Sequence, residues 1–341
     1  MLSVIDYANP GIRKKFGNPE QTVFRIPHGS AQVYLEIGNE TFSVKAPFLK
    51  LPESKIPLMR RITEINFGVL SLAQIVLEGE NLFFHFSCPT ELCYPYKVYE
   101  VLREICSNAD YLDDEFVDLF HAVRMAEPVV FPMDSARTEL AWAKLKQYLT
   151  ETEQYMAWFE SKRMEGFLWD VGMIQLRKIE YYMCPQGKLR NDLEGAVSNL
   201  NNGNIPFAER ISNLRKFIAS LQAMTREQFA ENLYATEVFI PYKYFSRIEN
   251  IKNNFKRTLE NATNELNNND FLGCTFTIQG GFMDLFYNNN LSPDIAEACE
   301  KALLESAGKP WKEAATILHA QMKIMVEGDL LTKLSDSINL N

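Results

Sequence analysis

The spacing of apolar residues changes near residue 130, and this change constrains the fold more than any other feature. Before it, apolar and polar residues alternate, most clearly over residues 31–37 and 42–46. Alternation of period two predicts antiparallel strands with one buried face. Beyond Pro128 and Pro132 the alternation almost disappears and apolar residues recur every three or four positions, which is typical of amphipathic helices. We therefore expect two domains, at residues 1–127 and 128–341.

The first domain is predicted to be α+β, with helices lying on an antiparallel sheet. The helix over 53–66 rests on Leu58, Ile62 and Ile65, which fall at i, i+4 and i+7. Glu78-Gly79-Glu80-Asn81 favours a hairpin between two strands. The expected order is β-β-β-α-β-β-α-α, with strands at 22–26, 31–37, 42–46, 70–77 and 82–87 and helices at 53–66, near Val98–Ile105 and near Phe116–Val123.

The second domain is predicted to be mainly helical. Its longest apolar stripe runs through Phe245, Ile248, Ile251, Phe255, Leu259, Ala262 and Leu266. Thr225 and Gln228 match a capping box. One exception is expected at 271–279, where β-favouring residues indicate a strand that ends in a tight turn at Gly280-Gly281.

Composition narrows the functional class. The 341 residues carry 35 Lys and Arg against 44 Asp and Glu, a net charge of -9, so no basic surface for nucleic acid is expected. We find no apolar run of about 18 residues, which argues against a membrane span. The six cysteines include no CxxC pair, which indicates reduced thiols in a cytoplasmic protein and no zinc site.

No catalytic motif emerges. Residues 279–283 match neither a dinucleotide-binding nor a P-loop pattern. The acidic run Asp113-Asp114-Glu115, with Asp110 and Asp118 nearby, offers oxygen ligands for a divalent ion. We interpret it instead as acids favoured at the start of a helix. The aromatic stretch over 142–169 is interpreted as core, so no catalytic, cofactor or metal residue is predicted.

The parts between residues 22 and 123 resemble the type III secretion chaperone-like fold, in its YbjN-type branch. A meander ends at 44–48, and the helix Met59-Arg60-Arg61-Ile62-Thr63-Glu64-Ile65-Asn66 closes on an asparagine, as in that family. Two strands follow, and Cys88-Pro89 leads through a polar-aromatic loop into the helix over 96–106. The resemblance implies a non-enzymatic, often dimeric domain that binds extended segments of partner proteins. About 210 further residues follow, which favours an interaction module fused to a second domain.

Two functions remain open at this point. The first is a protein-interaction or chaperone-like module, without catalytic activity, that binds a partner protein or a second copy of itself. An exposed edge strand would pair with an extended peptide, or the helical stripe would supply the contact. The second is an enzyme or small-molecule sensor with a pocket at the junction of the two domains. The residues predicted to bind a partner are Phe83, His85, Tyr94, Tyr96, Phe245, Ile248 and Phe255. With Leu82, Phe84 and Phe86 facing the core, Phe83 and His85 are expected to project to the opposite face of their strand.

Overall fold

The computed structural model describes residues 10–52, 56–126, 128–246 and 248–328, and it confirms an α+β protein with a mainly helical C-terminal region. The chain divides into two compact units. Unit 1 contains residues 1–139, 185–192 and 225–242, and unit 2 contains residues 140–184, 193–224 and 243–341. The sequence analysis expected two contiguous domains, at residues 1–127 and 128–341, whereas unit 1 also includes residues 185–192 and 225–242.

Unit 1 is built on an antiparallel sheet with the strand order β1-β2-β3-β5-β4. The alternation in the sequence becomes alternate burial along each strand, so that Phe42, Val44 and Ala46 of β3 are fully buried. A short strand, β6 (Val123–Arg124), pairs with the end of β3. The strands are β1 (Val23–His28), β2 (Ala31–Ile37), β3 (Thr41–Lys50), β4 (Gln74–Glu78) and β5 (Asn81–Pro89), and a short helix, α2 (Ile12–Phe16), precedes them.

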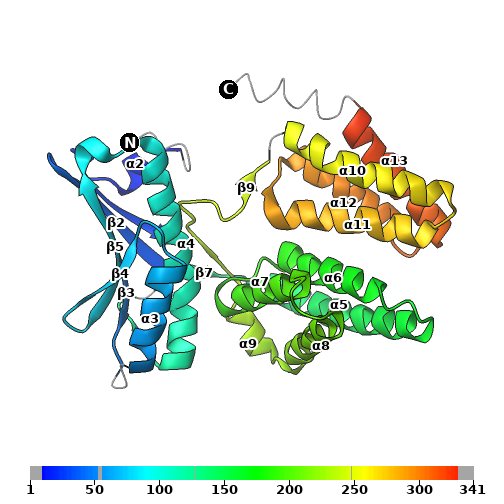
Figure 1. Ribbon diagram of the computed structural model, residues 1–341, viewed down its shortest axis with the longest axis horizontal. Coiled ribbons are helices and arrows are strands. Elements are labelled where there is room, and N and C mark those ends of the chain that lie inside the picture. Colours follow the sequence, from blue (N-terminus) through cyan, green and yellow to red (C-terminus); the bar gives the residue numbers. More distant parts are fainter. Residues whose placement is uncertain (1–9, 53–55, 127, 247, 329–341) are drawn as a thin grey trace. The chain divides into compact units, whose positions relative to one another are not determined.

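Two helices cover one face of this sheet (Figure 1). They are α3 (Ile56–Gly68) and α4 (Pro95–Phe120), and the 3-10 helix η1 (Thr90–Leu92) leads into α4. The prediction of two separate helices at 98–105 and 116–123 is wrong. Ala109 and Leu112 are buried and carry the apolar stripe between them, so the two stretches form one helix of 26 residues.

Two later segments return to unit 1. The second contains α9 (Arg226–Ala230), whose predicted capping box at Thr225 and Gln228 is confirmed, and β8 (Tyr234–Thr236), which pairs with β7 (Val130–Pro132). Phe239 and Ile240 of the same segment are buried in the core beneath the sheet. Residues more than 200 positions apart therefore share one core.

Unit 2 is helical, and its helices pack through apolar stripes. The predicted stripe places Phe255, Leu259 and Ala262 in the interior. Helix α11 packs against α6, α10 and α13, and α12 packs against α13. The helices are α5 (Ser135–Ser161), α6 (Phe167–Met183), α7 (Gly187–Asn201), α8 (Phe207–Ala223), α10 (Ile248–Asn267), α11 (Phe271–Asn288), α12 (Pro293–Ser306) and α13 (Trp311–Glu327), of which α5 and α7 begin in unit 1. Two short strands, β9 (Tyr244–Phe245) and β10 (Asn289–Asn290), pair in parallel.

The expected strand at 271–279 and the turn at Gly280-Gly281 are wrong, because both lie inside α11. The Asp270 side chain accepts a hydrogen bond from the Gly273 backbone N–H at 2.8 Å and caps the helix. Cys274, Ile278 and Phe282 then follow at helical spacing and are all buried. Burial along this stripe outweighs the weak strand preference of the local residues. Across the described ranges, no helix combines the length and apolar character needed to cross a membrane.

Candidate functional site

The face of the sheet opposite α3 and α4 carries a row of side chains in register across all five strands. Arg25 of β1 pairs with Tyr34, Tyr34 with Lys45, Lys45 with His85, and His85 with Gln74 of β4. Side chains on paired residues lie on the same face. We call these five residues the cross-strand row, and they form a continuous polar and aromatic strip on the face that α3 and α4 leave uncovered.

Cations lie over the aromatic rings of this face. The Lys45 ammonium is 4.0 Å from the centre of the Phe83 ring and 2.6 Å from a carboxylate oxygen of Glu78. The Arg25 guanidinium is 5.6 Å from the centre of the Tyr34 ring and has no ion pair with any residue that the structure describes. The prediction that Phe83 and His85 project away from the core is confirmed: both are half-buried, whereas Leu82 and Phe84 are fully buried. Arg25 therefore offers a positive charge that can pair with an incoming carboxylate.

The β4 edge of the sheet is closed to strand pairing at its centre. The Asn66 side chain bonds both backbone groups of Ile75: its amide donates to the Ile75 carbonyl at 3.0 Å and its oxygen accepts from the Ile75 N–H at 2.7 Å. Glu104 accepts from the backbone N–H groups of Leu72 and Ala73. These bonds occupy backbone groups that an added peptide strand would need.

The β1 edge is closed in a similar way. The Val23 carbonyl accepts from the Asn18 N–H at 2.9 Å, and the Val23 N–H donates to the Asn18 side chain at 3.0 Å. Pro27 has no N–H to donate. Among the described strands, the outer face of the sheet is thus better suited to a partner than its edges.

The other predicted partner residues lie elsewhere. Tyr94 and Tyr96 stand at the start of α4, with 65% and 77% of their surfaces exposed. Phe255 is only 3% exposed and packs against Phe282 inside unit 2, so its ring belongs to the core and is not accessible to a partner. Phe245 lies in β9 and Ile248 begins α10.

A second feature of unit 1 is a partly buried polar cluster around Asp110 of α4. One Asp110 oxygen accepts from the Tyr242 hydroxyl at 2.6 Å, and the other accepts from the backbone N–H and the hydroxyl of Ser30. The Arg190 guanidinium lies 3.6 Å from the centre of the Tyr242 ring. These contacts join the β1–β2 turn and α4 to both returning segments.

His28 forms the deepest part of this cluster. Its ring Nδ1 accepts hydrogen bonds from the backbone N–H groups of Phe239 at 3.0 Å and Ile240 at 3.3 Å, so Nδ1 is unprotonated. Burial lowers the pKa of His28 to about 4, and Arg190 adds to this shift while Asp110 opposes it. A neutral His28 therefore serves as a hydrogen-bond acceptor for the returning chain.

The acidic run is not at the start of a helix, so that interpretation is wrong. Asp113 and Asp114 lie in the C-terminal half of α4, where both pair with Arg124 of β6. Burial raises the pKa of both carboxyl groups, that of Asp114 to about 6, against the opposing effect of Arg124. No group of three or more potential metal ligands occurs among the described residues. The run therefore serves to hold β6 against α4.

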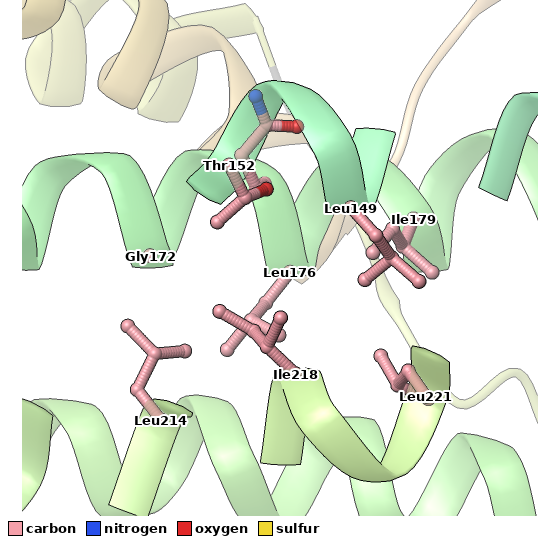
Figure 2. A pocket seen from close by; sticks show the side chains of 9 residues that line it. Leu149, Thr152, Gly172, Leu176, Ile179, Leu214, Ile218 and Leu221 are labelled. Atoms are coloured by element: carbon pink, nitrogen blue, oxygen red, sulfur yellow. The ribbon is translucent and has the colours of Figure 1, made fainter. Parts of the chain in front are cut away.

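Unit 2 contains a pocket between α5, α6 and α8 (Figure 2). Figure 2 shows the Leu214, Ile218 and Leu221 side chains of α8 directed toward α5 and α6. Its lining is almost entirely apolar and leaves no room for a water molecule. A methyl group on Gly172 would meet Leu214 at 2.5 Å, which shows how closely the helices approach. Thr152 and Gln175 are the polar residues of the lining, but because the space is too small even for water, we interpret this pocket as a packing seam between the three helices.

The aromatic stretch predicted to form core does so in part. Phe159 is fully buried and stacks on Phe167 at 4.9 Å between ring centres, whereas Trp158 is 39% exposed.

No family model matches the chain, and no curated protein matches it. Sequence reasoning found Phe83 and His85 but missed Arg25, Tyr34 and Lys45, because their alignment depends on strand register that the alternation alone does not supply.

Proposed function

We propose that unit 1 is a polypeptide-binding module that takes a segment of a partner protein on the outer face of its sheet. The observation that carries this proposal is the cross-strand row, in which Arg25 and Tyr34 stand on a face that α3 and α4 leave uncovered. Tyrosine and arginine are the residues most often found at energetic centres of protein interfaces. The resemblance of residues 22–123 to the secretion chaperone-like fold supports the same function.

The dimensions and charges of the row define its partner. Five strands at a spacing of about 4.8 Å span about 20 Å, which matches an extended segment of about six residues. An acidic residue would pair with Arg25, and apolar or aromatic residues would cover Tyr34 and Phe83. Glu36 and Glu78 on the same face disfavour a nucleic acid backbone. A reducing compartment such as the cytoplasm is part of the proposal, because all six cysteines are unpaired.

Selection of peptides by the full chain tests this function. A random peptide library is displayed on phage, and the enriched sequences are measured by fluorescence anisotropy. We expect peptides with an acidic and an aromatic residue, and we expect Tyr34→Ala or Arg25→Glu to weaken their binding at least tenfold, which is about 1.4 kcal/mol. The matched control is Phe67→Ala, which removes an aromatic ring that is 88% exposed on α3 and should leave binding unchanged.

Two results would contradict the proposal: a library that yields no enriched peptide, or peptides that bind the outer-face variants as well as the wild-type chain. Two further experiments test other ligands for this face. Sedimentation measures the oligomeric state of the full chain, and a dimer that Tyr34→Ala dissociates would show that a second copy covers the face. In the anisotropy assay, a single-stranded oligonucleotide that displaces the peptide would point to nucleic acid.

A further inference from the structure

Two cysteines of unit 1 lie within reach of each other at the entrance to α4. The Sγ atoms of Cys88, the last residue but one of β5, and Cys93, just after η1, are 3.3 Å apart. A disulfide has an S–S distance of about 2.05 Å, and a small side-chain rotation closes the difference. Both residues are half-buried, so small oxidants reach them, whereas Cys106, Cys274 and Cys299 are buried.

We propose that Cys88 and Cys93 form a reversible disulfide when the protein meets a peroxide. The backbone around them is already in place for this bond. The Cys93 N–H donates to the Thr90 carbonyl at 3.1 Å, and Thr90 bonds the β2–β3 turn through its N–H to Glu40 and its hydroxyl to Gly38. The loop therefore holds the backbone of Cys93 near Cys88, so that only a side-chain rotation is needed to form the bond.

The surroundings of Cys93 also bear on which of the two sulfurs is oxidised first. Burial, the contact with Cys88 and the charge that Cys88 acquires raise the pKa of Cys93 to about 11, while Lys97 opposes the shift. Cys93 thus keeps its proton at neutral pH and is a poor first target for peroxide, because the thiolate is the reactive form of a cysteine, and the proposal takes Cys88 as the sulfur that is oxidised first.

The reaction consumes one peroxide for each disulfide. The Cys88 sulfur attacks one peroxide oxygen, the O–O bond breaks, and water leaves a sulfenic acid on Cys88. The Cys93 sulfur then attacks the Cys88 sulfur, the S–S bond forms, the S–O bond breaks, and a second water leaves. Two thiols are oxidised by two electrons, and the peroxide is reduced to two waters.

The disulfide would link the end of β5 to the residue that precedes Tyr94, the N-cap of α4. Tyr94 and Tyr96 are exposed, so oxidation would fix the position of an aromatic surface at the start of this helix. This inference does not depend on peptide binding by the outer face of the sheet, and its test does not use a peptide.

Peptide mapping tests the proposal directly, because trypsin releases both cysteines in one peptide. Residues 62–97 contain no internal lysine or arginine and no other cysteine. The full chain carrying Cys184→Ser, which removes the exposed thiol, is treated with hydrogen peroxide, alkylated with iodoacetamide and digested. We expect peptide 62–97 to be lighter by two hydrogens and to carry no alkyl group, and dithiothreitol to restore two alkylation sites.

Two controls make the result specific. In Cys93→Ser the reaction should stop at the Cys88 sulfenic acid, which dimedone traps, and buried Cys106 should remain a thiol throughout. In the chain that retains Cys184, the internal disulfide should form at least tenfold faster than crosslinked dimers, because the two sulfurs share one chain. Peptide 62–97 with two alkyl groups after peroxide treatment, Cys88 oxidised beyond the sulfenic acid without a disulfide, or dimers that form first would each overturn the proposal.

Discussion

The contacts that stabilise unit 1 internally differ in kind from those that stabilise unit 2. In unit 2 the helices pack mainly through apolar stripes, both between neighbours such as α10 and α11 and between α11 and the more distant α6, with a few ion pairs such as that of Lys243 with Glu180. Unit 1 also has an apolar core, but its returning segments are fixed by polar contacts such as those of His28 with Phe239 and of Asp110 with Tyr242. Polar contacts require a defined partner at a defined distance, whereas apolar packing tolerates many partners. Unit 1 should therefore be sensitive to the loss of single polar groups, and unit 2 to changes of volume.

The largest expected effect is that of His28→Ala. It leaves the N–H groups of Phe239 and Ile240 without an acceptor in a buried site and opens a cavity, so we expect the free energy of unfolding of unit 1 to fall by about 3–5 kcal/mol. Hydrogen exchange of peptides from β1 to β3 measures unit 1. Tryptophan fluorescence measures unit 2, because all four tryptophans, at 142, 158, 169 and 311, lie there.

The control for this change is His85→Ala on the outer face of the sheet, which should cost less than about 0.5 kcal/mol. Equal losses in the two histidine variants would contradict the polar role of His28, and a loss seen mainly in tryptophan fluorescence would break the contrast between the units.

A second prediction concerns acid. The pKa of His28 is lowered from 6.5 to about 4, so unfolding takes up a proton between these values. The contribution of neutral His28, about 3 kcal/mol, is complete above pH 6.5 and is lost as the pH falls to 4. Burial raises the pKa of Asp114 from 3.8 to about 6, which gives the opposite slope between those values. The two slopes offset each other near pH 5.

Removal of the acid should expose the histidine. In Asp114→Asn, the stability of unit 1 should fall more steeply between pH 6.5 and 4 than in the wild-type protein, and adding His28→Ala should abolish this extra slope. Urea titrations followed by hydrogen exchange, corrected for intrinsic exchange at each pH, give the measurement. An unchanged slope in Asp114→Asn would show that the two groups do not oppose each other.

The smallest effect is expected in unit 2, from two glycines inside helices. Gly172→Ala places a methyl group 2.5 Å from Leu214 and 2.8 Å from Leu200, so we expect a loss of about 2 kcal/mol from overpacking. Gly280→Ala meets no atom within 4 Å and should stabilise unit 2 by about 0.5–1 kcal/mol through its better helix propensity. Tryptophan fluorescence in urea reports both changes. If Gly172→Ala is neutral, the α5–α6–α8 seam is looser than its contacts indicate.

The same contrast explains how much of the molecule could be predicted from the sequence. Local patterns sufficed for the five main strands of unit 1, except that β4 begins at Gln74 rather than at residue 70, and for the outward direction of Phe83 and His85, because each depends on residues a few positions apart. They failed at 271–279, where Asp270 and the helical spacing of buried residues outweighed local strand preference. Asn66, noted only as the end of a helix, bonds a strand edge nine residues later.

The polar contacts of His28, Asp110 and Asp114 could not be predicted from local sequence patterns. His28 follows a strand and precedes a turn, and nothing near it in the sequence indicates that its acceptors lie at 239 and 240. Asp110 and Asp114 were noted as part of an acidic run, but their partners Tyr242 and Arg124 could not be assigned without the fold. The cross-strand row likewise needed the register between strands before Arg25 and Tyr34 could be placed beside Lys45.

The return of the chain to unit 1 has a consequence for synthesis on the ribosome. His28 and the backbone group that it binds at Phe239 are 211 positions apart. At about 5–20 residues per second, the nascent sheet waits about 10–40 s before its last segment is made. During that interval β1 and the inner side of α4 lack the residues that later bury them, so a holding chaperone or a slow stretch of translation would have its greatest effect before residue 242 emerges.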